Sequence, residues 1–206
     1  MPKVIDRDAR RRAVAAALLR LAARAGLEAV SVRSVAAECG ISPGAVQKIF
    51  PSKEEMILGA LELTEERLES RYASLPHDAG LDVHLRQALP LDERRREEAI
   101  MIMAFSARAA GRSDWSKLLA EGYRTIQDAT AELLRRAQRD GLIEADRDAA
   151  DMAAGLVALS DGFAARLLQL PPDSAEARGL LRALDASVRA LLGITSGWIP
   201  RATPGG

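Results

Sequence analysis

The chain has little of several residue types, and each shortage excludes a class of protein. It contains a single cysteine, Cys39, so an internal disulfide is impossible and we expect a reducing compartment. Aromatic residues make up only 3% of the 206 residues, and no aromatic cage for a quaternary ammonium ligand is evident. No apolar run reaches the length of a membrane span, and the N-terminus lacks an apolar signal core. We therefore expect a cytoplasmic protein without a membrane partner.

Residues with the spacing of a catalytic or metal site are also scarce. His77 and His84 lie seven positions apart without a nearby third metal ligand. Cys39 is predicted to be a small buried hydrophobe, and neither it nor any serine has an identifiable base partner. The sequence therefore predicts no enzyme, no catalytic residue, no metal site and no cofactor.

The net charge is zero, but the charge is unevenly distributed along the chain. Residues 1–53 contain ten Lys or Arg and four Asp or Glu, which gives a net charge of +6. The remaining residues contain 19 basic and 25 acidic side chains, a net charge of −6. A basic segment attached to an acidic body favours contact with phosphate groups at one end of the chain only.

Helical periodicity is nearly continuous, and no segment shows strand alternation flanked by hairpin turns. Glycine and proline breaks predict an all-α fold of about nine helices, three short ones at the basic end and about six in the acidic body. We expect them at about 8–25, 53–72, 81–89, 92–111, 114–140, 148–170 and 174–192, with two more in 32–50. The helix at 148–170 is apolar on two sides, so both sides must be covered.

Residues 32–50 carry the most informative pattern. Gly40 ends one short helix, Ser42 caps the next, and Pro43 takes its first position, where a missing N–H costs nothing. Apolar residues are expected to pack the two helices together: Val35, Ala36, Cys39, Ile41, Val46 and Phe50. Two helices joined by a turn with glycine form the helix-turn-helix that places one helix in a DNA major groove. The sequence thus predicts a DNA-binding regulator.

A helix packed on a helix-turn-helix, followed by Phe-x-Ser-Lys-Glu and a long helix, resembles the TetR family of bacterial transcriptional regulators. The matching residues are Ala36, Gly40, Ile41, Ser42, Gly44, Phe50, Ser52, Lys53 and Glu54. Residues 89–93, 140–143 and 159–163 look like the ligand-binding domain of the choline/betaine-regulator branch. The resemblance implies an all-helical homodimer with a DNA-binding domain over 1–52 and a ligand-binding and dimerisation domain over 53–193. From the sequence itself we expect a flexible tail over 194–206.

The two short helices supply the candidate contacts to double-stranded DNA. Arg33 and Ser34 begin the first helix, where backbone N–H groups and a guanidinium meet phosphate. The full set of candidates is Arg33, Ser34, Ser42, Pro43, Gly44, Ala45, Gln47, Lys48 and Lys53. Most family members carry an aromatic residue at the place of Gln47, and often histidine or tyrosine at that of Ile49. Gln47 is able to read adenine through its amide instead, whereas Ile49 offers only apolar contact.

Bulky residues on the helices at 92–111 and 114–140 are the candidates for binding a small-molecule effector. They are Met101, Met103, Phe105, Trp115, Tyr123 and Ile126, although each is also a typical core residue. The resulting expectation is a repressor that a small hydrophobic effector releases from a palindromic operator. The alternative is a helical interaction protein of TetR-like architecture that has lost specific DNA binding, for which Gln47 and Ile49 are the only hints.

Overall fold

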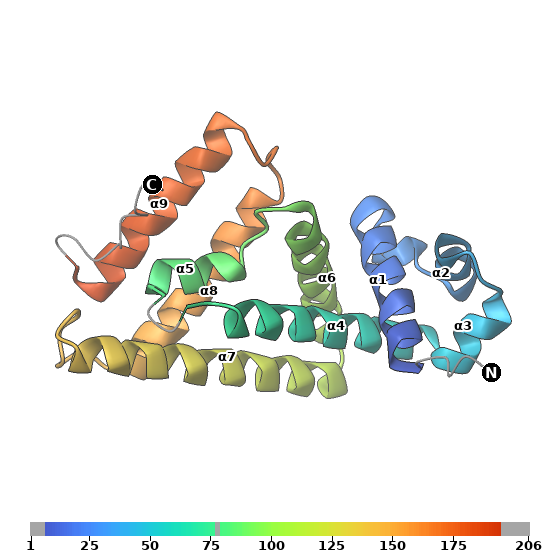
Figure 1. Cartoon of the computed structure of the whole chain (residues 1–206), viewed down its shortest axis with the longest axis horizontal. Helices are drawn as coiled ribbons and strands as arrows, with labels where there is room; N and C mark the ends of the chain where they lie inside the picture. Colours follow the sequence, from blue (N-terminus) through green and yellow to red (C-terminus); the bar gives the residue numbers. More distant parts are fainter. Residues whose placement is uncertain (1–6, 77–78, 195–206) are drawn as a thin grey trace. The chain divides into compact units, whose positions relative to one another are not determined.

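The computed structural model describes residues 7–76 and 79–194, which contain nine α-helices, one 3₁₀ turn and no strand (Figure 1). The helices are α1 (Arg7–Ala25), α2 (Val32–Cys39), α3 (Pro43–Ile49), α4 (Lys53–Ala73), α5 (Leu81–Gln87), α6 (Glu93–Ala109), α7 (Ser113–Arg139), α8 (Ala149–Leu167) and α9 (Ala175–Leu192). The predicted all-helical fold is confirmed. In this part of the chain no helix is long and apolar enough to cross a membrane. His77 and the predicted tail, apart from Ile194, lie outside the described residues.

Internal contacts divide the chain into two units, and each is described by itself. Unit 1 comprises residues 1–74 and 92–105, and unit 2 comprises residues 75–91 and 106–206. Unit 1 therefore holds α1 to α4 and most of α6. Unit 2 holds α5, the end of α6, and α7 to α9.

The core of unit 1 comes from the apolar faces of its first four helices. Helix α1 packs against α2 and α4, and α2 packs against α3 (Figure 1). Leu18 of α1, Val35 of α2, Val46 of α3 and Ile57 of α4 are all at most 1% exposed. Full burial of such a side chain stabilises the fold by about 1.5–3 kcal/mol, so these positions fix the helix-turn-helix on its supporting helices.

Two residues predicted for this core lie elsewhere. Ile41 is 40% exposed, and Cys39 is only half-buried. The reason is the backbone of Gly40, which has φ +66° and ends α2 in the left-handed conformation. The chain turns away from the helix axis at this point, and the Ile41 side chain therefore faces solvent. Burial raises the pKa of the half-buried Cys39 thiol.

Serine and aspartate caps begin several helices, and the one predicted at Ser42 is confirmed. Ser42 Oγ accepts a hydrogen bond from Ala45 N at 3.2 Å, directly before Pro43 at the first position of α3. Ser52 Oγ accepts from Glu55 N at 3.1 Å, which is one half of a capping box at the start of α4. Asp92 Oδ1 accepts from Arg95 N at 2.8 Å at the start of α6.

In unit 2, α8 packs against both α7 and α9 (Figure 1). Gly155 allows a close approach to α9, because a Cβ there would lie 3.2 Å from Leu191 Cδ2. Helix α8 is thus covered by α7 and α9, although its apolar residues Leu159 and Phe163 are only half-buried. A row of small residues on α8 nevertheless remains exposed, namely Ala154, Ala158 and Gly162.

Candidate nucleic-acid interface

The predicted DNA-binding residues lie on α2, on α3 with its cap, and at the start of α4. Arg33 is exposed in the first turn of α2, and Gln47 and Lys48 are exposed on α3. Ser42, Pro43 and Gly44 are also exposed, whereas Ser34, Ala45 and Lys53 are half-buried. The surface of the helix-turn-helix is therefore formed by small residues that allow close approach and by two flexible cations.

Ser34 has a structural task that the sequence pattern did not reveal. Its hydroxyl accepts a hydrogen bond from Ser31 N at 2.9 Å, while Ser31 Oγ accepts from Ser34 N at 3.1 Å. This reciprocal capping box begins α2. The Ser34 hydroxyl also donates its hydrogen to Ala29 O at 3.0 Å. The hydroxyl is therefore already engaged within the protein. The pattern Ser-x-x-Ser was a usable signal, but glutamate or glutamine is the usual residue at the last position of such a box.

Ser42 differs from Ser34, because its cap uses the hydroxyl oxygen only as an acceptor. The hydroxyl hydrogen thus remains available as a donor to a phosphate oxygen. In the N-terminal turn of α3, Pro43 has no N–H and the Ala45 and Val46 N–H groups donate to Ser42, which leaves the Gly44 N–H available. Both features suit contact with a negatively charged ligand.

The cations of the helix-turn-helix are distinguished by their ion pairing. Within the described part of the chain, no carboxylate pairs with Arg33, Lys48 or Lys53. The arginines of α1 behave differently, because four of them pair with acidic residues of α2 or α4. These pairs are Arg11–Glu62 at 2.8 Å, Arg12–Glu66 at 2.9 Å, Arg20–Glu38 at 3.1 Å and Arg24–Glu38 at 2.8 Å. The unneutralised positive charge of this unit's helix-turn-helix therefore resides on the residues predicted to contact DNA.

Glu38 shows how the paired arginines act. Hydrogen bonds from Arg24 and Arg20 lower the pKa of the Glu38 carboxyl. Arg20 and Arg24 project from α1 and Glu38 from α2, so the two bonds tie the helix-turn-helix to its supporting helix. These arginines thus stabilise the fold. They contribute less to the positive electrostatic field outside the protein than the number of basic residues in the sequence suggests.

Phe50 anchors the end of α3 to α4 through close packing that the sequence did not predict. Its side chain is completely buried, and the Arg11 guanidinium lies 4.4 Å from the ring centroid. Opposite the ring is Gly59 of α4, where a Cβ would lie only 2.3 Å from Phe50 Cε1. Glycine is therefore required for α4 to approach this close to the ring.

The predicted effector residues fall into two groups. Met101, Met103 and Phe105 belong to α6 in unit 1, and Trp115, Tyr123 and Ile126 belong to α7 in unit 2. Met101, Phe105 and Trp115 are buried, and the other three are half-buried.

Within unit 2, Tyr123 donates a hydrogen bond to Asp161 Oδ2 at 2.8 Å. Burial, together with Asp161, raises the pKa of Tyr123 to about 12. Burial also raises the pKa of Asp161, whereas the hydrogen bond from Tyr123 partly lowers it. The Tyr123–Asp161 bond joins α7 to α8.

Two protein-family models match the chain. Residues 14–60 match the model for bacterial regulatory proteins of the tetR family, and residues 78–193 match that for the C-terminal part of BetI-type transcriptional repressors. The first match spans the helix-turn-helix. The second alone covers more than half of the chain.

Relatives of known type agree with these matches. The chain is 29% identical over 170 residues to the HTH-type transcriptional regulator PksA of Bacillus subtilis, a match that covers 80% of this chain and 81% of PksA. The crystal structure of a transcriptional regulator from Rhodococcus sp. Rha1 is 33% identical, with a TM-score of 0.76, over 89% of this chain and 96% of that chain. A regulator from Saccharomonospora viridis in complex with choline has the same fold, with 23% identity and a TM-score of 0.72 over 88% and 96% of the two chains. The chain therefore belongs to the TetR family of bacterial transcriptional regulators, so it is a DNA-binding regulator and not an enzyme.

Proposed function

We propose that the protein is a homodimeric repressor that binds a palindromic DNA operator and leaves it when a small hydrophobic effector binds. The proposal rests on three cations, Arg33, Lys48 and Lys53, on the exposed side of the helix-turn-helix and at the start of α4. None of them has a carboxylate partner among residues 7–76 and 79–194. Repression is supported by the match to BetI-type repressors. Because bacterial DNA lies in the cytoplasm, the same proposal places the protein there.

In the proposed complex, α3 lies in the major groove. Gln47 reads an adenine through its amide, and Gly44 and Ala45 allow the helix to approach the base edges. Arg33, Lys48 and Lys53 contact phosphates, and Ser42 donates its free hydroxyl hydrogen to another. Pro43 limits the bulk at the start of α3, and Ser34 supports the start of α2.

Dimerisation is proposed through α8 and α9. Both helices carry exposed small side chains, Ala154, Ala158 and Gly162 on α8 and Ala183, Ala186 and Ala190 on α9. Small residues allow helices of two subunits to approach closely, and a two-fold axis between them would match a palindromic operator. Leu167 and Val188 are already buried within the subunit and therefore contribute to its fold.

We propose both predicted groups as candidate effector contacts, each within its own unit: Met101, Met103 and Phe105 of α6 in unit 1, and Trp115, Tyr123 and Ile126 of α7 in unit 2. Methionine side chains adapt to irregular apolar shapes, which favours a hydrophobic ligand of modest size. Choline is bound by the Saccharomonospora viridis regulator, and it is a natural comparison compound here. An effector lowers DNA affinity only if it binds the form that is unsuited to DNA more tightly. We assign residues 1–52 to DNA binding, 53–193 to effector binding and dimerisation, and 194–206 to a tail.

Selection of bound fragments from genomic DNA, followed by fluorescence anisotropy on the selected site, tests the proposal. Gln47→Ala is expected to weaken binding to the selected site by about 1–3 kcal/mol and to leave binding to unrelated DNA unchanged. Lys53→Ala is expected to weaken binding to both DNAs equally, because phosphate contacts carry no sequence information. If no fragment is enriched, specific DNA binding has been lost and the proposal is wrong.

A further inference from the structure

Unit 1 contains an open cavity of about 670 Å³ between α1, α4 and α6. Its volume falls within the range of about 300–1,000 Å³ that is typical of small-molecule sites. Five guanidinium groups line it, those of Arg12, Arg67, Arg71, Arg94 and Arg95, together with only two carboxylates. The cavity shares no lining residue with the proposed effector site, and the DNA-binding candidates also lie outside its lining.

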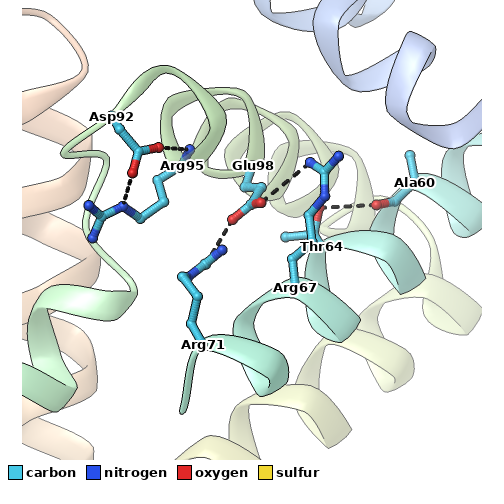
Figure 2. A network of polar contacts seen from close by, with 7 residues as sticks. All are labelled: Ala60, Thr64, Arg67, Arg71, Asp92, Arg95 and Glu98. Atoms are coloured by element: carbon cyan, nitrogen blue, oxygen red, sulfur yellow. Dashed lines mark hydrogen bonds and ion pairs between the residues drawn. The ribbon is translucent and has the colours of Figure 1, made fainter. Parts of the chain in front are cut away.

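A buried ionic cluster lies beside this cavity, and two of its arginines, Arg67 and Arg71, belong to the lining. Figure 2 shows the contacts of this cluster. Glu98 of α6 is 3% exposed and receives two guanidinium groups from α4. Arg67 Nη1 lies 3.4 Å from Glu98 Oε1, and Arg71 Nη2 lies 2.8 Å from Glu98 Oε2. One carboxylate thus faces two cations whose side chains are 13% and 23% exposed. Burying an excess charge in this way is costly unless a further anion balances it.

The other charged groups around the cavity do not remove this excess. Arg12 pairs with Glu66 at 2.9 Å, and Arg95 pairs with Asp92 at 2.7 Å, so both lining carboxylates already have a cation. Glu97 interacts with Arg67 but is shared with Arg20 of α1.

Arg94 adds a further positive charge to the lining. It is exposed, and among the described residues no carboxylate pairs with it. Burial and the like charge of Arg94 lower the pKa of Arg67. Among the described residues that line the cavity, five guanidinium groups therefore face two carboxylates, and positive charge remains there.

We propose that this cavity binds a small organic anion that carries at least two negative charges in phosphate or carboxylate groups. Guanidinium groups bind such oxygens through pairs of parallel N–H bonds, and several converge here from α4 and α6. The apolar part of the ligand lies against Ala9 and Ala13 of α1 and Leu63 of α4, which also line the cavity. Bound ligand would neutralise the excess charge and hold the start of α6 to α1 and α4.

Isothermal titration calorimetry of the full-length protein without DNA tests this site, with pyrophosphate and citrate as separate probes. The ionic strength is kept at about 0.15 M, where charges more than about 8 Å apart are screened. We expect at least one probe to bind with millimolar or tighter affinity. Pyrophosphate alone would identify a phosphate site, and citrate alone would identify a carboxylate site. Because DNA is absent, the result does not depend on the proposed repressor function.

Arg94→Gln and Arg95→Gln are expected to weaken binding about tenfold each, the loss typical of one charge-assisted hydrogen bond. Arg10→Gln is the matched control, because Arg10 is exposed on α1 but outside the cavity lining, and it should change the affinity less than about twofold. Circular dichroism of each variant checks that the helices are retained. The proposal is overturned if neither probe binds, if both lining variants bind normally, or if Arg10→Gln weakens binding as much as they do.

Discussion

Replacing Gly59 by alanine tests the packing that positions α3. The added Cβ would lie 2.3 Å from Phe50 Cε1 and 2.6 Å from Phe50 Cζ, well inside normal carbon contact. The ring is completely buried and has the Arg11 guanidinium 4.4 Å from its centroid, so it cannot rotate freely into open space. Either Phe50 or the whole of α3 must therefore shift.

Two opposing effects decide the magnitude. Alanine in a helix interior is favoured over glycine by about 1 kcal/mol. Inserting a methyl group into a well-packed core costs about 1–3 kcal/mol, and the overlap at Gly59 places this site at the upper end. We expect Gly59→Ala to lower the free energy of unfolding of unit 1 by about 1–2 kcal/mol. Operator affinity should fall as well, since Phe50 directly follows the proposed recognition helix.

Urea unfolding, with hydrogen exchange of the α3 amides to localise the change, measures this effect. Gly44→Ala is the control within the same unit, because nothing lies within 4 Å of a Cβ at that position, and its stability should stay within about 0.5 kcal/mol of the parent protein. Phe50→Leu removes the clashing ring atoms, so adding Gly59→Ala to Phe50→Leu should cost less than adding it to the parent. If Gly59→Ala is as stable as the parent protein, the close packing of α4 on Phe50 is wrong.

Three further predictions concern separate parts of the molecule. Tyr123 keeps its proton in the folded state up to about pH 12, so the free energy of unfolding should fall as the pH rises from about 10 to 12. In urea titrations at several pH values, Tyr123→Phe should make this decrease smaller, and an unchanged decrease would contradict the assignment. Ala158→Glu on the exposed side of α8 should yield monomers in sedimentation velocity, whereas Ala120→Glu on the exposed side of α7 should not; a native protein that sediments as a monomer at micromolar concentration would refute the dimer. Ser31→Ala removes the N-cap of α2 and should cost about 1 kcal/mol in thermal unfolding, and a loss near zero would show that the capping box contributes nothing.

Local signals in the sequence predicted the helix boundaries well. Gly40 and Ser42 act within a few residues of their own positions, through a left-handed backbone and a short hydrogen bond, so their effect is readable without a structure. The apolar positions Val35, Val46 and Phe50 were correctly assigned to the core for the same reason. The prediction that Ile41 packs in the core was wrong, because a residue in a turn has no helical periodicity to define which way its side chain faces.

Long-range contacts were beyond the reach of the sequence. Arg11 and Arg12 pair with acidic residues more than 50 positions away, so counting charges over residues 1–53 overestimated the positive field of that segment. The approach of Gly59 to Phe50 likewise depends on the crossing of two helices. The capping role of Ser34 was missed for a different reason, since the same hydroxyl is chemically suited to a phosphate contact and to a cap.

The salt dependence of operator binding tests the central claim most directly. If Arg33, Lys48 and Lys53 of both subunits contact phosphates, the logarithm of the binding constant should fall with the logarithm of salt concentration with a slope of about −5. Removing any one of the three by alanine substitution should reduce the slope by about two, since each substitution occurs twice in a dimer. A slope near zero, or a slope unchanged in all three variants, would contradict the assignment of this surface to DNA binding.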